Sequence, residues 1–161
     1  MNAGLLFYLA RKTLQCQKRI KKYIGFYDLS LSSVKICAKK GDLRPAMSQF
    51  IANLPVVFVV SDGGTRQPGC ALPIFDTLQI PLDSQGEPKG VLQLNGTDST
   101  GYLIESTNQA IVLLPDLPEE IMQMLPCACE RLNLKFDLNG SVPCEPDIDY
   151  EKFVEDSIKH K

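Results

Sequence analysis

Histidine is nearly absent from this sequence of 161 residues, which contains only His160. A nucleophile activated by a histidine base is therefore excluded in practice. The sequence also has no long apolar run, because the one near its start, residues 3–10, is too short to cross a bilayer. Basic residues follow that run, whereas a signal peptide carries them in front. We therefore expect a cytoplasmic protein with no membrane contact.

Acidic residues are missing from residues 1–27, which hold six lysines and arginines, whereas the chain from Asp137 onward holds seven acids and three lysines. Either these runs form two solvated helix faces that attract one another, or the basic helix guides a phosphorylated ligand or nucleic acid. Neither aromatic interleaving nor a recognised motif supports nucleic-acid binding. We expect no nucleic-acid partner.

Cysteine is present, but the chain lacks the secretory signal that would favour disulfides, so we expect reduced thiols. Cys127, Cys129 and Cys144 could supply three zinc ligands. However, two cysteines separated by one residue on a helix end point apart, and no nearby histidine completes a tetrahedral set. We expect no metal site there. The six cysteines are Cys16, Cys37, Cys70, Cys127, Cys129 and Cys144.

The composition is ordinary for a globular chain, with 44% hydrophobic and 22% charged residues and a formal net charge of −2. This length suits one domain. We assign residues 1–140 to an α/β domain. Residues 141–161 are predicted to form a linker, over 141–146, and a short acidic C-terminal helix whose apolar face carries Tyr150, Phe153, Val154 and Ile158.

Helices and strands are predicted to alternate in the first half of the chain. Apolar residues at helical spacing predict a helix over residues 4–24, and alternation predicts a strand over residues 34–38. Asp42 is placed to cap a helix over residues 44–52. Residues 54–60 contain the β-branched run V-V-F-V-V, which is typical of a central strand covered on both faces. We therefore expect a mainly parallel sheet sandwiched by helices.

Glycine, asparagine and proline punctuate the second half, so its elements are predicted from the segments between them. They are a helix over 72–78, strands over 102–105 and 110–114, a helix that opens with Glu119 and Glu120, and a last strand over 132–136.

Two loops are candidate ligand sites. The first, Ser61-Asp62-Gly63-Gly64-Thr65, follows the buried strand. Open α/β sheets bind ligands at the carboxyl ends of their strands, and paired glycines let the backbone approach a ligand closely. The second loop, between Leu114 and Glu119, offers backbone N–H groups beside a helix start and is a candidate anion-binding corner.

Two charged side chains near these loops are candidates for the same site. Arg66 is the best candidate for pairing with a phosphate, because a guanidinium group binds phosphate oxygens in pairs. Asp42 is either a helix cap or an acid of a metal or phosphate site, and both interpretations stay open at this point.

Four blocks of sequence, taken in order, resemble the molybdopterin-binding domain family. They are S-V-K-I-C-A-K-K-G-D (33–42), V-V-F-V-V-S-D-G-G-T (56–65), N-G-T-D-S-T-G-Y-L-I-E-S (95–106) and I-V-L-L-P-D-L-P-E-E-I-M-Q-M (111–124). The last block is similar to the family's strand, proline-rich loop and helix. The family includes molybdenum-cofactor biosynthesis proteins and the N-terminal domain of the competence/damage-inducible protein A type, and the resemblance is strongest to the latter.

The resemblance implies a three-layer α/β/α sandwich, a homo-oligomer, and a small phosphorylated ligand, either molybdopterin or a nucleotide, held with a divalent cation such as Mg²⁺. Asp42 matches the family's acidic residue after the second strand and is the one catalytic candidate. The expected ligand-binding residues are Asp62, Gly63, Gly64, Thr65, Arg66, Gly96, Thr97, Pro115 and Asp116.

The chain departs from the family at the positions of its chemistry. The helix predicted over residues 4–24 leaves almost no chain in front of it, so the family's first strand is expected to be missing. No carboxylate follows Thr65 until Asp76, where the family carries metal-binding acids. Asp116 replaces the glycine of the proline-rich loop and places a negative charge where a phosphate would lie. These changes are typical of a copy that keeps the frame and loses catalysis.

Three functions remain open from the sequence. The first is binding of a phosphorylated pterin or a nucleotide without catalysis, at Gly63-Gly64 and the Pro115–Pro118 loop. The second is a metal-dependent pyrophosphatase that acts on nucleotides of the ADP-ribose type. The third is a non-catalytic interaction or scaffold module.

Overall fold

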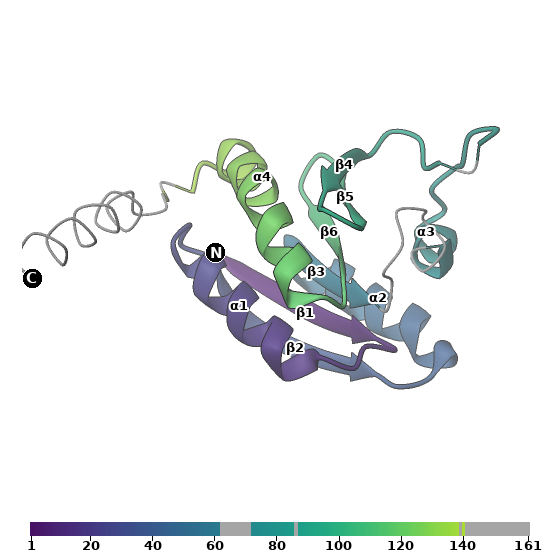
Figure 1. Cartoon of the computed structure of the whole chain (residues 1–161), viewed down its shortest axis with the longest axis horizontal. Coiled ribbons are helices and arrows are strands. Elements are labelled where there is room, and N and C mark those ends of the chain that lie inside the picture. The colour runs from purple at the N-terminus through teal and green to yellow at the C-terminus, as the bar shows by residue number, and fades with distance from the viewer. Residues whose placement is uncertain (62–71, 86, 139, 141–161) are drawn as a thin grey trace, which may run out of the picture.

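A computed structural model describes residues 1–61, 72–85, 87–138 and 140. They build one sheet of six strands in the order β2-β1-β3-β6-β5-β4, with helices on both faces (Figure 1). The strands are β1 (Asn2–Tyr8), β2 (Ser30–Cys37), β3 (Val56–Ser61), β4 (Leu92–Asn95), β5 (Thr100–Glu105) and β6 (Ala110–Pro115), and the helices are α1 (Thr13–Gly25), η1 (Lys40–Asp42), α2 (Leu43–Asn53), α3 (Leu72–Leu78) and α4 (Pro118–Phe136).

The sheet is mixed, and its larger part is parallel. Strands β2, β1, β3 and β6 run parallel to one another, whereas β5 and β4 are antiparallel additions beside β6. Helix α1 connects β1 to β2, and α2 connects β2 to β3, as crossovers between parallel strands require. The prediction of a mostly parallel α/β sheet is confirmed.

Two apolar clusters, one on each face of the sheet, make the three-layer sandwich. Helices α1 and α4 cover one face, where Ile20 and Ile121 share a cluster with Phe58. Helices α2 and α3 cover the other, where Met47 and Phe75 join the cluster of Val57. All six residues of β3 are buried, which is the pattern that its continuous β-branched run predicts.

The first strand is present, so the predicted helix over residues 4–24 is wrong over residues 4–12. Residues Asn2–Tyr8 form β1, which lies between β2 and β3, while α1 begins only at Thr13. Both faces of β1 are covered, so its apolar residues do not alternate, and the spacing of Leu5, Tyr8 and Leu9 imitates that of a helix. The expectation that the family's first strand is missing is therefore wrong.

The last predicted strand, over residues 132–136, is also wrong, because α4 continues to Phe136. Leu132, Leu134 and Phe136 alternate in sequence, but Leu132 is buried at the helical spacing of Leu125 and Ala128, whereas Leu134 is 80% exposed. The predicted linker over 141–146 and the C-terminal helix lie outside the described residues.

The other predicted elements agree with the structure to within a few residues at their ends. The helix over residues 72–78 coincides with α3. The strand predicted over 34–38 is longer, since β2 begins at Ser30, and β4 has no counterpart among the predicted strands. No described helix is both long and apolar enough to span a bilayer.

Candidate functional site

The carboxyl ends of the parallel strands meet at one edge of the sheet. Tyr8 of β1 pairs with Cys37 of β2 and with Ser61 of β3, and Ser61 pairs with Pro115 of β6. The four strands therefore end level with one another, and the loops that follow them share this edge. Ligands of open α/β sheets bind at such an edge. We refer to it as the carboxyl edge.

The turn between β4 and β5 lies at the same edge. Strand β5 runs antiparallel to β6, with Tyr102 opposite Leu113, so its first residue, Thr100, lies toward the Pro115 end. Asn95 pairs with Thr100, and Gly96 N–H donates to the carbonyl oxygen of Ser99 at 3.0 Å. The topology thus brings Gly96 and Thr97 to the edge that holds Pro115 and Asp116.

Asp116 binds the backbone that leads into α1. One carboxylate oxygen accepts the N–H of Arg11 at 2.7 Å, and the N–H of Lys12 lies 3.1 and 3.3 Å from the two oxygens. Asp116 is 6% exposed, and Lys12, the N-cap of α1, provides no side-chain cap of its own. A carboxylate at a helix start offsets the partial positive charge there. Asp116 therefore occupies an anion position at α1.

Asp116 also acts on a neighbouring thiol. The Sγ of Cys16 lies 3.7 Å from the carboxylate Oδ1, and burial, together with the charge of Asp116, raises the pKa of Cys16 to about 12. A thiol with such a pKa stays protonated at neutral pH, so Cys16 is a core residue rather than a nucleophile.

Glu120, in the first turn of α4, fixes the turn between β4 and β5. Its Oε1 accepts the N–H groups of Asp98 and Ser99 at 2.9 and 3.0 Å and the Ser99 hydroxyl at 2.8 Å. Burial alone would raise the pKa of Glu120, but these hydrogen bonds outweigh burial and lower it below its ordinary value.

Gly96 is needed for this arrangement. A Cβ at position 96 would lie 2.3 Å from the Glu120 Oε1, so only glycine lets the carboxylate reach the turn. The hydroxyl of Thr97 donates to Gln123 Oε1 at 2.9 Å. Both residues are predicted to bind a ligand, and in this structure both contact α4.

Asp42 stands apart from this network. It is exposed at the end of η1 and occupies the N-cap position of α2, but its side chain makes no capping hydrogen bond. The interpretation of Asp42 as a side-chain cap is therefore wrong in its geometry. Asp42 ends η1, which follows the carboxyl end of β2, the outermost parallel strand.

The described carboxylates do not fit a magnesium site. Mg²⁺ takes oxygen ligands in near-octahedral geometry, but Asp116 and Glu120 use their oxygens to accept protein N–H groups. Within residues 1–61, 72–85, 87–138 and 140, no three His, Cys, Asp or Glu side chains gather. The predicted residues Asp62, Gly63, Gly64, Thr65 and Arg66 lie outside the described part of the chain.

Strain marks the loop after β1. Leu9 has a φ of 55°, a left-handed conformation that is uncommon for a leucine, and its N–H donates to the carbonyl oxygen of Cys37 at 2.9 Å. Strained backbone collects at functional positions in proteins. The sequence contains no signal for Leu9 or for the backbone groups of Arg11 and Lys12. Every residue except proline has the same backbone N–H group, so residue type does not show which of them is used.

One polar group in the core beneath α3 has no partner. The hydroxyl of Tyr102 is the only buried side-chain nitrogen or oxygen without a hydrogen bond among the described residues. Tyr102 is 1% exposed and packs edge-to-face on Phe75 of α3, with ring centroids 5.1 Å apart. Burial and then the charge of Glu87 raise the pKa of Tyr102 to about 12.

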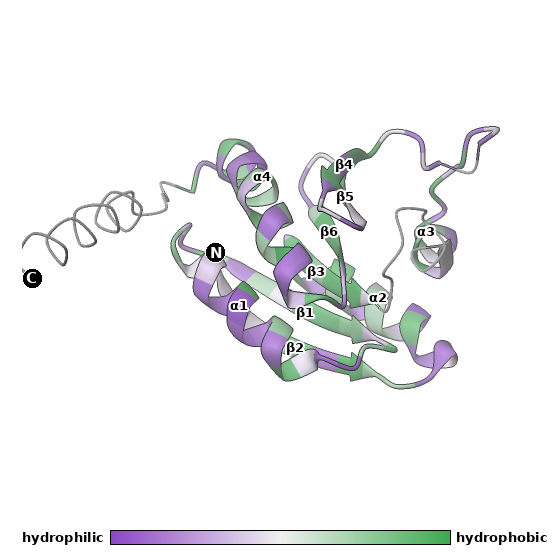
Figure 2. Ribbon diagram, in the orientation of Figure 1, coloured by the Kyte–Doolittle hydropathy of each residue, from purple (hydrophilic) through white to green (hydrophobic). Residues whose placement is uncertain are grey.

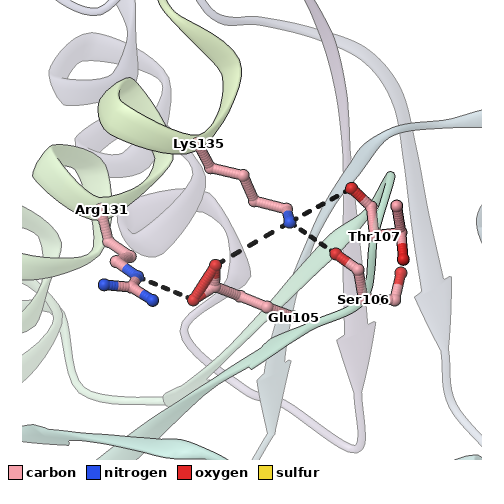
Figure 3. Close-up of polar contacts among 5 residues, drawn as sticks. All are labelled: Glu105, Ser106, Thr107, Arg131 and Lys135. Carbon is pink, nitrogen blue, oxygen red and sulfur yellow. Dashed lines mark hydrogen bonds and ion pairs between the residues drawn. The ribbon is translucent and has the colours of Figure 1, made fainter.

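The opposite edge of the sheet is held by charged contacts (Figure 3). Glu105 accepts Arg131 Nε at 2.8 Å and lies 3.9 Å from Lys135 Nζ, which also donates to the carbonyl oxygens of Ser106 and Thr107. These contacts fasten the end of α4 to the turn before β6. A hollow of about 540 Å³ lies beside that turn, lined by residues 51–55 and 106–109. No predicted site residue lies there.

Solved structures with this fold support the architecture. A CinA protein of unknown function from Thermoplasma acidophilum aligns with a TM-score of 0.64 at 10% identity, over 81% of this chain and 96% of its own. A MogA structure aligns at 0.54 with 16% identity, over 85% and 98%. The molybdopterin biosynthesis enzyme MoaB from Thermus thermophilus aligns at 0.54 with 14% identity, over 83% and 95%.

No protein-family model and no curated protein matches the sequence. At these identities the likeness shows the fold alone. The chain has the MoaB/Mog-like molybdopterin-binding fold, as the four ordered sequence blocks predict.

Proposed function

We propose that this chain is a divergent molybdopterin-binding-like domain that binds a phosphorylated pterin or a nucleotide at its carboxyl edge, between Gly63-Gly64 and the Pro115–Pro118 loop, without catalysing a reaction. The proposal rests on the fold of MoaB, MogA and CinA, and on the level ends of β1, β3 and β6.

The observation that carries the proposal is the direction of the Asp116 side chain. Its carboxylate accepts hydrogen bonds from the N–H groups of Arg11 and Lys12, so its negative charge is offset at the start of α1. The N-cap of α4, Leu117, has no side-chain cap. The start of α4 therefore keeps backbone N–H groups for an anion, which supports the Pro115–Pro118 loop as a phosphate contact.

The absence of catalysis is inferred from the use of the acids. Asp116 and Glu120 accept hydrogen bonds from the protein itself, and Asp42 follows β2, which β1 and β3 separate from β6. A metal-dependent pyrophosphatase needs carboxylates that converge on a divalent cation. The described carboxylates do not converge.

Thermal unfolding with molybdopterin, ADP and ADP-ribose, each with and without Mg²⁺, tests ligand binding. A ligand at about 100 times its Kd stabilises the folded state by about 2.7 kcal/mol, so one of the three is expected to raise the Tm by several degrees. If none of them raises it, the binding proposal is wrong.

The variant Asp116→Gly restores the residue of the family's loop and frees the N–H groups of Arg11 and Lys12. Loss of the buried carboxylate is expected to destabilise the free protein by about 1–3 kcal/mol, while a second anion position at α1 tightens binding of a phosphorylated ligand. Asp98→Asn is the matched control, because Asp98 is an exposed acid of the same edge. Equal ligand affinities of the two variants would contradict the role given to Asp116.

Catalysis is tested by incubating ADP-ribose with the protein and Mg²⁺ or Mn²⁺. We expect no release of AMP. Release that Asp42→Ala abolishes would establish the pyrophosphatase and refute a binding domain without catalysis.

A non-catalytic interaction module is the second candidate. It is favoured by the buried carboxylate of Asp116, which occupies the anion position at the start of α1 and so keeps a ligand anion out of it. It predicts that ADP raises the Tm of the Asp116→Gly variant and that none of the three ligands raises the Tm of the unaltered chain. That pair of results would replace the ligand-binding proposal with this one.

A further inference from the structure

The outward face of α1 carries both cationic and apolar side chains. Lys18, Arg19, Lys21 and Lys22 are all exposed, and no acid occurs between residues 11 and 25. At 100° per residue, Lys18 and Lys21 lie on one stripe with Leu14, which is 65% exposed. Figure 2 shows this helix with a largely hydrophilic outer surface. We call the surface made by Leu14 and these four cations the basic face of α1.

The basic face has no ionic partner in the part of the chain that the structure describes. Both ion pairs there join Glu105 of β5 to α4. Like charges at neighbouring helix positions repel one another. Repulsion among the cations of the basic face therefore destabilises the helix, and an acidic partner would reduce that repulsion.

The last described residue, Gly140, lies beside the end of α1. Asn133 of α4 and Gly140 exchange two hydrogen bonds, at 3.3 and 3.4 Å. A Cβ at Gly140 would lie 2.1 Å from Tyr27 Cα and 2.8 Å from the carbonyl oxygen of Phe26, so Gly140 packs directly on the two residues that follow α1. Residues 141–161 therefore start at the C-terminal end of the basic face.

The sequence of residues 141–161 complements that face. Six acids lie between Glu145 and Asp156, with Lys152 the only cation among them. Tyr150, Phe153 and Val154 are spaced so that a helix would place them on one side. The segment thus offers both negative charge and apolar surface, which are the two properties that match the lysines and Leu14.

We propose that residues 145–156 dock on the basic face of α1 in the same molecule, running from the end of α1 back toward Arg11. The length is sufficient, because the 13 residues of α1 span about 20 Å, and a segment of about 12 residues covers about 18 Å even as a helix. The docked segment brings its negative charge along the helix whose start contacts Asp116 at the carboxyl edge.

Cleavage of the full chain by a glutamate-specific protease, at low and at high NaCl concentration, tests the docking. Contacts between exposed charges weaken as salt screens them. In low salt we expect Glu151 and Glu155 to be cut about tenfold more slowly than in a synthetic peptide of residues 141–161, because cleavage follows the undocked fraction. High salt is expected to remove this protection.

Three matched variants identify the surface. Lys18→Gln with Lys21→Gln and Lys22→Gln should abolish the protection, whereas Lys39→Gln with Lys40→Gln and Lys89→Gln, which removes three exposed lysines elsewhere, should preserve it. Lys18→Glu with Lys21→Glu and Lys22→Glu, combined with Glu151→Lys, Glu155→Lys and Asp156→Lys, should restore a contact of reversed sign. That contact is read by trypsin cleavage at the new lysines, against a peptide with the same three lysines.

Some results would overturn the proposal. Equal cleavage rates for the full chain and the peptide in low salt would show that the segment is undocked. Protection that grows with protein concentration would assign the contact to a second copy instead of the same molecule. Protection that survives the Lys18, Lys21 and Lys22 substitutions would place the segment on another surface.

Discussion

Two residues at the carboxyl edge, Asp116 and Glu120, have carboxylates that hold main-chain N–H groups. Acids near a candidate site are usually first considered as catalysts or metal ligands. Here the geometry gives both a structural role, since each satisfies donors at the start of a helix or in a tight turn. From the sequence, the charge of Asp116 is expected to repel a phosphate in the proline-rich loop. In the structure the carboxylate points to the start of α1 instead of the start of α4.

Glu120→Gln tests the role of Glu120 through pH. Because the folded-state pKa lies below the ordinary 4.5, the ionised carboxylate stabilises the fold above pH 4.5, and this contribution is lost as the pH falls through the folded-state pKa. We expect Glu120→Gln to lose about 1–3 kcal/mol in urea unfolding at neutral pH and much less at a pH below the folded-state pKa. Glu119→Gln, at an exposed neighbour in the same helix turn, should lose much less than Glu120→Gln at neutral pH, because it removes only a favourable charge at the helix start. An equal loss for Glu120→Gln at both pH values would contradict the assignment.

Tyr102→Phe is expected to stabilise the protein, which is unusual for a change in a core. The variant removes a buried hydroxyl that has no hydrogen bond, and an unsatisfied group of this kind costs about 1–3 kcal/mol. Tyr27→Phe is the control, because Tyr27 is also buried but its hydroxyl is not an unsatisfied group, so this change should not stabilise the protein. A lower free energy of unfolding for Tyr102→Phe would show that the hydroxyl has a partner in solution.

Among the elements, β1 determines the architecture. It pairs with β2 on one side and β3 on the other, and its residues contribute to both apolar clusters. Loss of this strand would leave β2 without a neighbour in the sheet. The short run N-A-G-L-L-F-Y is therefore as important to the fold as the more conspicuous run in β3.

Gly4 makes the packing of β1 testable. A Cβ there would lie 2.5 Å from Leu54 Cδ1 and 2.8 Å from Phe50 Cδ2, so Gly4→Ala is expected to cost about 1–3 kcal/mol through overpacking. Gly25→Ala, where a Cβ meets nothing within 4 Å, should instead be neutral or stabilising by about 0.4–1 kcal/mol. Chemical denaturation of the two variants checks both values, and a Gly4→Ala variant as stable as the parent would show that β1 tolerates added volume.

For the whole molecule, the fold can be predicted from the sequence more completely than the site. The runs in β3 and β6 and the proline that opens α4 are local signals, and their order is enough to indicate the MoaB/Mog-like architecture. The strand β1 escapes prediction because a strand buried on both faces has no period of two and because, unlike β3, it contains no β-branched residue. The Asp116 contact escapes it because its partners are backbone groups more than a hundred residues away, whose positions depend on the assembled sheet.

Lys135 illustrates the same limit. In the predicted strand over 132–136 it would lie on the polar face of a sheet, whereas on α4 it reaches Glu105 and the carbonyl oxygens of Ser106 and Thr107. The residue type of Lys135 does not tell a strand from a helix. Its position is known only because α4 extends to Phe136.

The contact between Asp116 and Arg11 joins positions separated by 105 residues, and it has a consequence for the order of folding. The start of α1 receives its carboxylate only after β6 has paired with β3, so α1 must form first with an uncapped end or wait for that pairing. Contacts of such long sequence separation slow folding, because the loop between them has to close first. During synthesis, the first helix of this chain therefore reaches its final stability only after residue 116 has left the ribosome.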